Sequence, residues 1–275
     1  MPTLLHDRTR NQLQALATSG VASVIFHGPH RIGKFRAAGD FADALNCPES
    51  DRYIIAPADK PSISIEQIRS LLAPLSLSLT TPNGARVVII DRAETLTVEA
   101  QNALLKLIEE PPRRTAFVLV ADQLERLLPT VRSRCAAVYF PRFSETTLAG
   151  WLTTAHNLKP AQAAHLATAA DGVPGEALNL AANPGAVETA LELRRQAVSI
   201  PALPLFQRLL LAKKLLDSKA DLAQFGQLIH THLVEQARQG NRPDAHRFSA
   251  LEQFRTALSA KVAPRVALEQ LMVEF

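Results

Sequence analysis

The sequence predicts an α/β domain built on a parallel sheet, followed by segments that are all helical. Three observations support this prediction. In the first half of the chain, short apolar runs of strand length alternate with stretches of helical periodicity, which is typical of strands connected by helices that cover the sheet. After Pro141 the strand-like runs stop, and the segments that follow have helical periodicity. The length of 275 residues is sufficient for two or three compact units.

The elements of the first half are predicted from apolar runs and from helix start and stop signals. Continuous apolar runs suit strands that are buried on both faces of a sheet. The predicted strands are Ser23–His27, Arg86–Asp91 and Ala116–Ala121. The predicted helices are Arg8–Leu16, Lys34–Leu45, Ser64–Leu72 and Val98–Glu109. Ser64 and Gln67 have the spacing of a capping box, and Pro111 and Pro112 end the last of these helices.

The second half of the chain is predicted to contain only helices. Ser144–His156 and Pro160–Asp171 form a helix pair that ends at the break Gly172–Gly175, and a further helix follows. From about Val187 onward, each segment has the periodicity of an amphipathic helix. We therefore expect three domains, namely an α/β domain over residues 1–142, a small helical domain over 143–184 and a helical bundle over 185–275.

The composition is that of an ordinary folded protein, with 47% hydrophobic and 20% charged residues. Charged residues occur too early in the N-terminal segment for a signal peptide, and no apolar run approaches the roughly 18 to 20 residues that span a bilayer. We therefore expect a soluble, cytoplasmic protein without a membrane partner. The formal net charge of +4 is compatible with work beside nucleic acid but does not indicate it.

Metal ligands are scarce in the sequence. Cys47 and Cys135 are the two cysteines, and two cysteines cannot form a four-thiolate zinc site. The eight histidines show no metal-ligand spacing, since His230 and His232 are two apart on a predicted helix and point in different directions. We therefore predict no metal site and interpret both cysteines as buried thiols.

A phosphate-binding loop is predicted directly after the first strand. Gly28–Lys34 has the order G-x-x-x-x-G-K of a Walker A motif between a strand and a helix. In such a loop, backbone N–H groups surround phosphate oxygens, Gly28 and Gly33 allow close approach, and Lys34 adds a positive charge. Phe35 follows at the position where the motif needs a Ser or Thr hydroxyl to bind Mg²⁺. We therefore expect any binding of ATP or ADP to be weak and hydrolysis to be poor.

Asp91 belongs to a second part of the same site. Four apolar strand residues precede it, as in a Walker B motif, so it lies at the C-terminal end of its strand. Ligand sites of parallel α/β sheets lie at these ends, which places Asp91 beside the phosphate loop. The next residue is Arg92, a cation where the residue that orients the attacking water would be an anion.

Three further motifs carry a resemblance to a known family. They are NALLKLIEEPP (Asn102–Pro112), LLPTVRSRC (Leu127–Cys135) and GVPGEALNLA (Gly172–Ala181). In this order and spacing they resemble successive signatures of the bacterial DNA polymerase III clamp-loader subunits, which are AAA+ proteins. The resemblance covers residues 1–185, and the helical remainder is similar to the collar domain of the same family. It implies an AAA+ P-loop domain, a helical lid domain and an all-α collar domain.

The resemblance also implies roles for single residues. Ser133–Cys135 resembles the motif whose arginine reaches into the ATP site of the adjacent subunit, where a guanidinium can neutralise charge on the transferred phosphoryl group. Where many members have an arginine that touches the γ-phosphate in cis, this chain has Glu176. The predicted site residues are therefore Arg134, an arginine finger acting in trans, and a degenerate nucleotide site of Gly28, Gly33, Lys34 and Asp91.

The sequence keeps the motif arginine, Arg134, but has a defective nucleotide site. This combination favours a non-motor subunit of the delta-prime type. The implied partners are the gamma/tau and delta subunits and, through the assembly, the sliding clamp and primer–template DNA. Family members usually carry a four-cysteine zinc module between the first helix and the next helical segment, which this chain lacks apart from Cys47. We therefore expect no zinc and no required cofactor. Two alternatives stay open: an active AAA+ ATPase of the gamma/tau type, and a nucleotide-independent assembly module without a trans finger.

Overall fold

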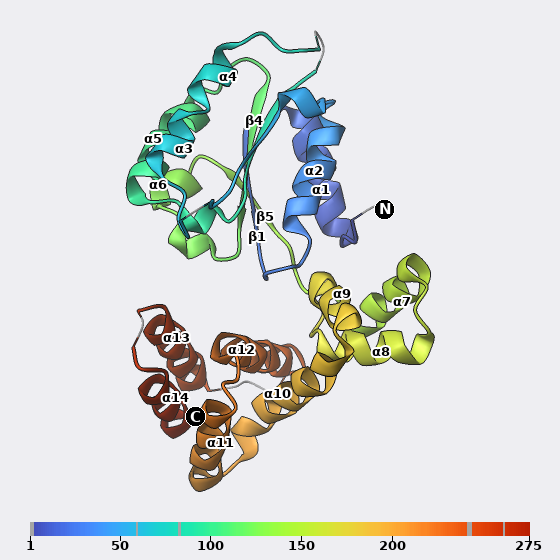
Figure 1. Ribbon diagram of the computed structural model, residues 1–275, viewed down its shortest axis with the longest axis vertical. Helices are drawn as coiled ribbons and strands as arrows, with labels where there is room; N and C mark the ends of the chain where they lie inside the picture. Colours follow the sequence, from blue (N-terminus) through green and yellow to red (C-terminus); the bar gives the residue numbers. More distant parts are fainter. Residues whose placement is uncertain (1–2, 59, 82–83, 241–243, 261) are drawn as a thin grey trace. The chain divides into compact units, whose positions relative to one another are not determined.

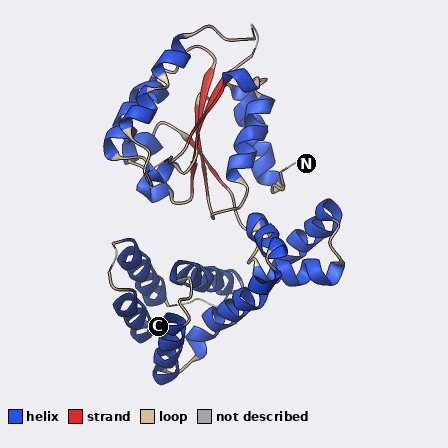
Figure 2. Cartoon of the chain, in the orientation of Figure 1, coloured by secondary structure: helices blue, strands red, loops and turns tan. Residues whose placement is uncertain are grey.

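A computed structural model describes residues 3–58, 60–81, 84–240, 244–260 and 262–275. The chain forms two compact units. The first contains Met1–Ala167 and Gly172–Leu178, and the second contains Thr168–Asp171 and Asn179–Phe275. Figure 2 shows that strands occur in the first unit and that helices make up the second. The predicted succession of an α/β part and a helical part is confirmed, whereas the division into three domains at residues 142 and 184 stays a prediction.

The first unit is built on a five-stranded sheet in the order β2-β3-β4-β1-β5. Each pair of neighbouring strands is parallel. The strands are β1 (Ser23–His27), β2 (Arg52–Ile55), β3 (Arg86–Ile90), β4 (Thr115–Ala121) and β5 (Ala136–Tyr139). The three predicted strands are confirmed as β1, β3 and β4, which occupy the centre of the sheet and are almost completely buried.

The sequence did not predict β2 and β5, which are the two edge strands. Each has four residues, and each is partly exposed, with Ile54 and Tyr139 more than half exposed. An edge strand covered on fewer sides needs no continuous apolar run, so its sequence pattern is weak. The pairing of β5 with β1 nevertheless matters, because it brings the chain after Tyr139 against the loop that follows β1.

Nine helices of four or more residues begin within the first unit's part of the described chain. They are α1 (Asp7–Ser19), α2 (Lys34–Ala44), α3 (Ile65–Arg69), α4 (Leu72–Ser76), α5 (Val98–Glu109), α6 (Pro129–Arg132), α7 (Glu145–His156), α8 (Pro160–Ala169) and α9 (Pro174–Ala182). The predicted helix Ser64–Leu72 is confirmed at its start but ends earlier, at Arg69, and a second short helix, α4, begins at Leu72. Pro74 has no N–H to donate to the carbonyl of Ser70, so one continuous α-helix cannot pass through it. The capping box is present, and the Ser64 N–H donates to Gln67 Oε1 at 3.0 Å.

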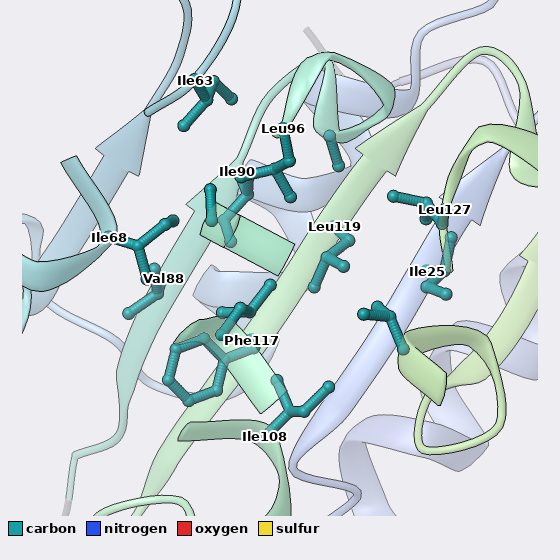
Figure 3. Close-up of a cluster of buried hydrophobic side chains, with 14 of the residues drawn as sticks. Ile25, Ile63, Ile68, Val88, Ile90, Leu96, Ile108, Phe117, Leu119 and Leu127 are labelled. Carbon is teal, nitrogen blue, oxygen red and sulfur yellow. The ribbon is translucent and has the colours of Figure 1, made fainter. Parts of the chain in front are cut away.

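Two layers of helices cover the sheet. Figure 1 shows α1 and α2 on one face and α3 to α6 on the other. On the α2 face, the rings of Phe26 and Phe41 are 5.9 Å apart and meet edge to face. The opposite face forms a large buried cluster in which side chains of β1, β3 and β4 meet those of α3 and α5 (Figure 3). It includes Ile25, Val88, Phe117 and Ile108. This packing holds the C-terminal ends of the central strands rigidly in place.

A buried arginine connects the start of β3 with the chain before it. The Arg86 side chain is 2% exposed and donates from Nη1 to the Leu75 carbonyl at 2.9 Å and from Nη2 to the Leu77 carbonyl at 3.0 Å. Its Nη2 also lies 3.7 Å from the carboxylate of Asp51, which is buried as well. These contacts tie the end of α4 and the segment before β2 to the sheet.

The second unit is a bundle of helices around its own core. Its helices are α10 (Val187–Ser199), α11 (Leu205–Asp217), α12 (Leu222–Arg238), α13 (Ala245–Ser259) and α14 (Pro264–Glu274). The core contains Leu193, Phe225, Leu233, Phe254 and Leu268. In the described part of the chain, every helix is too short or too polar to cross a bilayer.

Candidate functional site

The loop after β1 has glycines in the two places where a phosphate-binding loop needs them. Gly28 has a φ of +141°, and a Cβ on it would lie 2.4 Å from the carbonyl oxygen of Phe140, so only glycine fits there. Gly33 has a φ of +105° and is the N-cap of α2, which starts at Lys34. The predicted strand–loop–helix arrangement is confirmed, with the N-terminal end of α2 directed at the loop.

The side chain of Lys34 is enclosed by its own chain. It is 3% exposed, and its Nζ donates to the carbonyl oxygens of Gly28 at 2.8 Å and Pro29 at 2.6 Å. A third bond joins Nζ to Asp122 Oδ1 at 2.8 Å. A lysine ammonium has three N–H donors, so these three acceptors satisfy it completely.

Asp122 is the residue that sequence reasoning missed. It follows β4, the strand next to β1, and its carboxylate binds Lys34 through one oxygen and His30 Nδ1 through the other, at 2.7 Å. Its backbone N–H donates to Glu94 Oε2 at 3.2 Å. A signal for it was available, since Asp122 directly follows a buried predicted strand just as Asp91 does.

Asp91 lies where the sequence places it, directly after β3. Burial raises its pKa, and the negative charge of Asp122 raises it further, while the cations Arg92 and Lys34 act in the opposite direction. Burial also raises the pKa of Glu94, with Asp122 again adding to the effect. The structure therefore gathers three carboxylates, those of Asp91, Glu94 and Asp122, around the single ammonium of Lys34.

The three positions expected to impair the site differ in their surroundings. Phe35 is 43% exposed, and its ring offers no oxygen ligand for a metal ion. Arg92 is exposed and has a positive φ of 52°. Glu176 lies against the phosphate loop, where its Oε2 accepts a hydrogen bond from Arg31 Nη1 at 2.9 Å. An anion therefore stands beside this loop, as the sequence predicts.

Arg134 lies in a different part of the same unit, just after α6. Its side chain is 40% exposed, and Nη1 donates to the Thr130 carbonyl at 3.0 Å and lies 3.4 Å from Ser133 Oγ. Its Nε forms an ion pair with Glu109, the last residue of α5. The structure thus brings Gly28, Gly33, Lys34 and Asp91 together and places Arg134 apart from them on the surface.

The cysteines have the environments of structural thiols. Cys47 is buried, and burial raises its pKa. Cys135 is partly buried, and desolvation raises its pKa to about 12. Among the described residues, no three His, Cys, Asp or Glu side chains are grouped as metal ligands. The absence of zinc stays a prediction.

Comparison with known families finds similarity to subunits of DNA polymerase III. Residues 48–144 match the family model described as DNA polymerase III, delta subunit. The DNA polymerase III subunit delta' of Pseudomonas aeruginosa is 32% identical over 162 residues, which are 50% of this chain and 49% of that protein. The subunit delta' of Escherichia coli is 38% identical over 133 residues, 47% of this chain and 39% of that protein.

A DNA polymerase III subunit of another kind matches as well. The subunit tau of Bacillus subtilis is 28% identical over 185 residues, 57% of this chain and 32% of that protein. The matches therefore span about half or less of the relatives' own length.

Solved structures share the fold at low sequence identity. A DNA polymerase III gamma subunit-related protein of Thermotoga maritima has a TM-score of 0.50 and 20% identity, over 97% of this chain and 98% of that chain. RuvB of Thermotoga maritima has a TM-score of 0.53 and 15% identity, over 94% of this chain and 78% of that chain. With the five-stranded parallel sheet, this likeness shows an α/β domain with the AAA+ fold, followed by helices. The resemblance seen in the sequence is thus confirmed over about half of the chain, which is similar there to the delta' subunits of the DNA polymerase III clamp loader.

Proposed function

We propose that this chain is a non-motor subunit of a DNA polymerase III clamp loader with little or no ATPase activity of its own. The observation that carries this proposal is that the Lys34 ammonium is fully hydrogen-bonded within its own chain. A lysine that serves a bound triphosphate must direct its ammonium at the phosphates, whereas here two carbonyls and Asp122 satisfy all three donors. Phosphate would have to displace a neighbouring carboxylate from a buried ammonium, which weakens binding.

The residues around the loop do not fit a magnesium–nucleotide complex. Phe35 replaces the hydroxyl that would bind Mg²⁺, and Glu176 and Asp122 place negative charge beside the expected phosphates. Arg92 stands where an active motor has the water-orienting glutamate. These features act independently, and each of them lowers the expected rate of hydrolysis in cis.

Arg134 supports a role in trans. It is partly exposed and lies outside the chain's own phosphate loop, so it is accessible to a neighbouring subunit. There its guanidinium would stabilise the charge on the phosphoryl group that the neighbour transfers. Loss of the chain's own hydrolysis is compatible with this role, because a finger needs only a fixed cation at the surface.

The remaining parts of the chain complete the proposed assembly. Residues 143–184 would be the lid and residues 185–275 the collar through which the subunit assembles. The proposed partners are gamma/tau and delta subunits, with the sliding clamp and primer–template DNA reached through the complex in the cytoplasm. The amphipathic helices of the second unit are suited to such an assembly, since α11 exposes Phe206 and Leu210.

Steady-state ATP hydrolysis by the purified chain tests the proposal directly. The reaction would contain Mg²⁺ and primed DNA, and the Lys34→Ala variant would serve as the background control. We expect no turnover above that background. Turnover that Lys34→Ala abolishes would show that the three defects are compensated and that the chain is a motor.

One alternative keeps some support. The phosphate loop and Asp91 are present, and the match with tau extends over 57% of this chain, which favours an ATPase of the gamma/tau type. The same hydrolysis assay separates the two possibilities. A nucleotide-independent assembly module without a trans finger would instead be indicated if Arg134→Ala left the ATP turnover of the reconstituted loader unchanged.

A further inference from the structure

We infer that Glu109 is a positioning residue that holds Arg134 ready for the neighbouring ATP site, an inference that rests on the proposed function. Glu109 is the last residue of α5, and its carboxylate forms an ion pair with Arg134 Nε. The Thr130 carbonyl holds Nη1 of the same guanidinium at 3.0 Å. Two different nitrogens are therefore bound from two sides, which fixes the plane of the group.

Both members of the pair stand on a rigid frame. Ile108, next to Glu109, and Val131, in the helix before Arg134, belong to the same buried cluster. The buried side chain of Gln101 joins α5 to the segment that leads into α6, because its Oε1 accepts from the Leu128 N–H at 2.7 Å. The ion pair therefore spans two helices whose backbones are already fixed, and it adds the orientation of the guanidinium itself.

The stability of α5 does not explain an acidic residue at this position. A negative charge in the last turn of a helix is disfavoured by the helix dipole, which prefers cations there. Glu109 is therefore better explained by its partner than by its helix. Its neighbour Glu110 is also acidic and exposed, and it offers a matched control in the same charge environment.

The exposure of the pair suits a guanidinium that must also meet phosphate. The side chains are 40% and 43% exposed, and ion pairs in water of this kind contribute little to stability. Holding the group in one orientation before the neighbour arrives lowers the entropic cost of the productive geometry. Glu109 thus favours a competent orientation without binding Arg134 too tightly to let it face a triphosphate.

The experiment is ATP turnover by the full loader, reconstituted from this chain and the gamma/tau-type and delta subunits of the same organism, with primed DNA. We expect Arg134→Ala to lower the turnover number at least about tenfold. Glu109→Ala should lower it about threefold at unchanged KM for ATP, and Glu109→Gln, which keeps an acceptor oxygen, should recover part of the loss. Glu110→Ala should match the unmodified chain.

The double variant Glu109→Ala/Arg134→Ala gives the decisive readout. If Glu109 acts through Arg134, it should be no slower than Arg134→Ala alone, because the two losses are not additive. A further loss in the double variant, or unchanged turnover in Glu109→Ala, would overturn the positioning role while leaving the finger in place. Unchanged turnover in Arg134→Ala would instead overturn the finger and, with it, the positioning role.

Discussion

Lys34 and Arg134 are two cations of one folding unit with opposite surroundings. Lys34 is 3% exposed and has three acceptors from its own chain, whereas Arg134 is 40% exposed and is held by one carboxylate and one carbonyl. A cation that is fully satisfied inside its own chain has no bond left to offer a ligand, while a partly exposed one keeps this capacity. This contrast is the basis of the proposed function, in which Arg134 acts on a neighbouring ATP site and Lys34 does not support hydrolysis in its own.

The largest expected difference concerns ATP turnover in the reconstituted loader. Arg134→Ala should lower turnover at least about tenfold, because under the proposed function it removes a cation that faces the transition state in a neighbour. Lys34→Ala should leave turnover within about twofold, since under the proposed function ATP is not hydrolysed at the phosphate loop that contains Lys34. Steady-state phosphate release from the two variant complexes at equal occupancy is the measurement. Equal losses of ATP turnover in both variant complexes would contradict the proposed difference between Lys34 and Arg134.

The free energy of unfolding should be affected more by substitution of Lys34 than by substitution of Arg134. Lys34→Met leaves Asp122 Oδ1 and two carbonyls without the lysine donor, while His30 still binds Asp122 Oδ2, so we expect a loss of about 2 kcal/mol in the free energy of unfolding. Arg134→Met removes only an exposed pair and should change it by less than ~0.5 kcal/mol. Urea unfolding of the full chain followed by circular dichroism compares the variants. A larger loss for Arg134→Met would mean that this arginine has a structural role.

Removing the charge of Asp122 should reduce the difference between Lys34 and Arg134 in their availability to a ligand. Asp122→Asn keeps the shape of the side chain but removes the charge that competes with phosphate, so Lys34 becomes available to an anion. We expect about a fivefold gain in affinity for fluorescent ADP, with no matching gain for Asp40→Asn, a substitution on the exposed side of α2. If Asp122→Asn binds ADP no better than the unmodified chain, the ion pair between Asp122 and Lys34 is not what weakens nucleotide binding.

Sequence reasoning reached the central strands and the motif positions but not the contacts between them. The buried runs of β1, β3 and β4 predict a sheet, because a strand covered on both faces must be apolar throughout. The closure of Lys34 by Asp122 depends instead on which strands are neighbours, and chain order alone does not give the order β4-β1.

The same limit applies to side chains that work against their usual preference. A buried arginine such as Arg86 is unexpected in a strand, and the positions of the Leu75 and Leu77 carbonyls and of the Asp51 carboxylate explain it. Likewise, the pair of Glu109 with Arg134 joins two motifs that are each visible in the sequence, yet their contact requires the packing of α5 against the segment before α6. Motif spacing predicts which residues matter, and tertiary structure decides what each of them touches.

The smallest expected effect concerns Glu94, one of the three carboxylates around Lys34. Burial raises the pKa of Glu94 above its ordinary value of 4.5, so the folded chain binds a proton more readily than the unfolded chain. Stability should therefore decrease as the pH rises from about 4.5 to the folded pKa and then level off.

Glu94→Gln keeps an acceptor for the Asp122 N–H and removes this decrease, so it should be more stable than the unmodified chain at neutral pH by less than about 1 kcal/mol. Urea unfolding at several pH values between 4 and 8 measures the difference. If Glu94→Gln is instead less stable at neutral pH, the Glu94 carboxylate is favourably paired with Lys34, and the excess of negative charge at this site is only apparent.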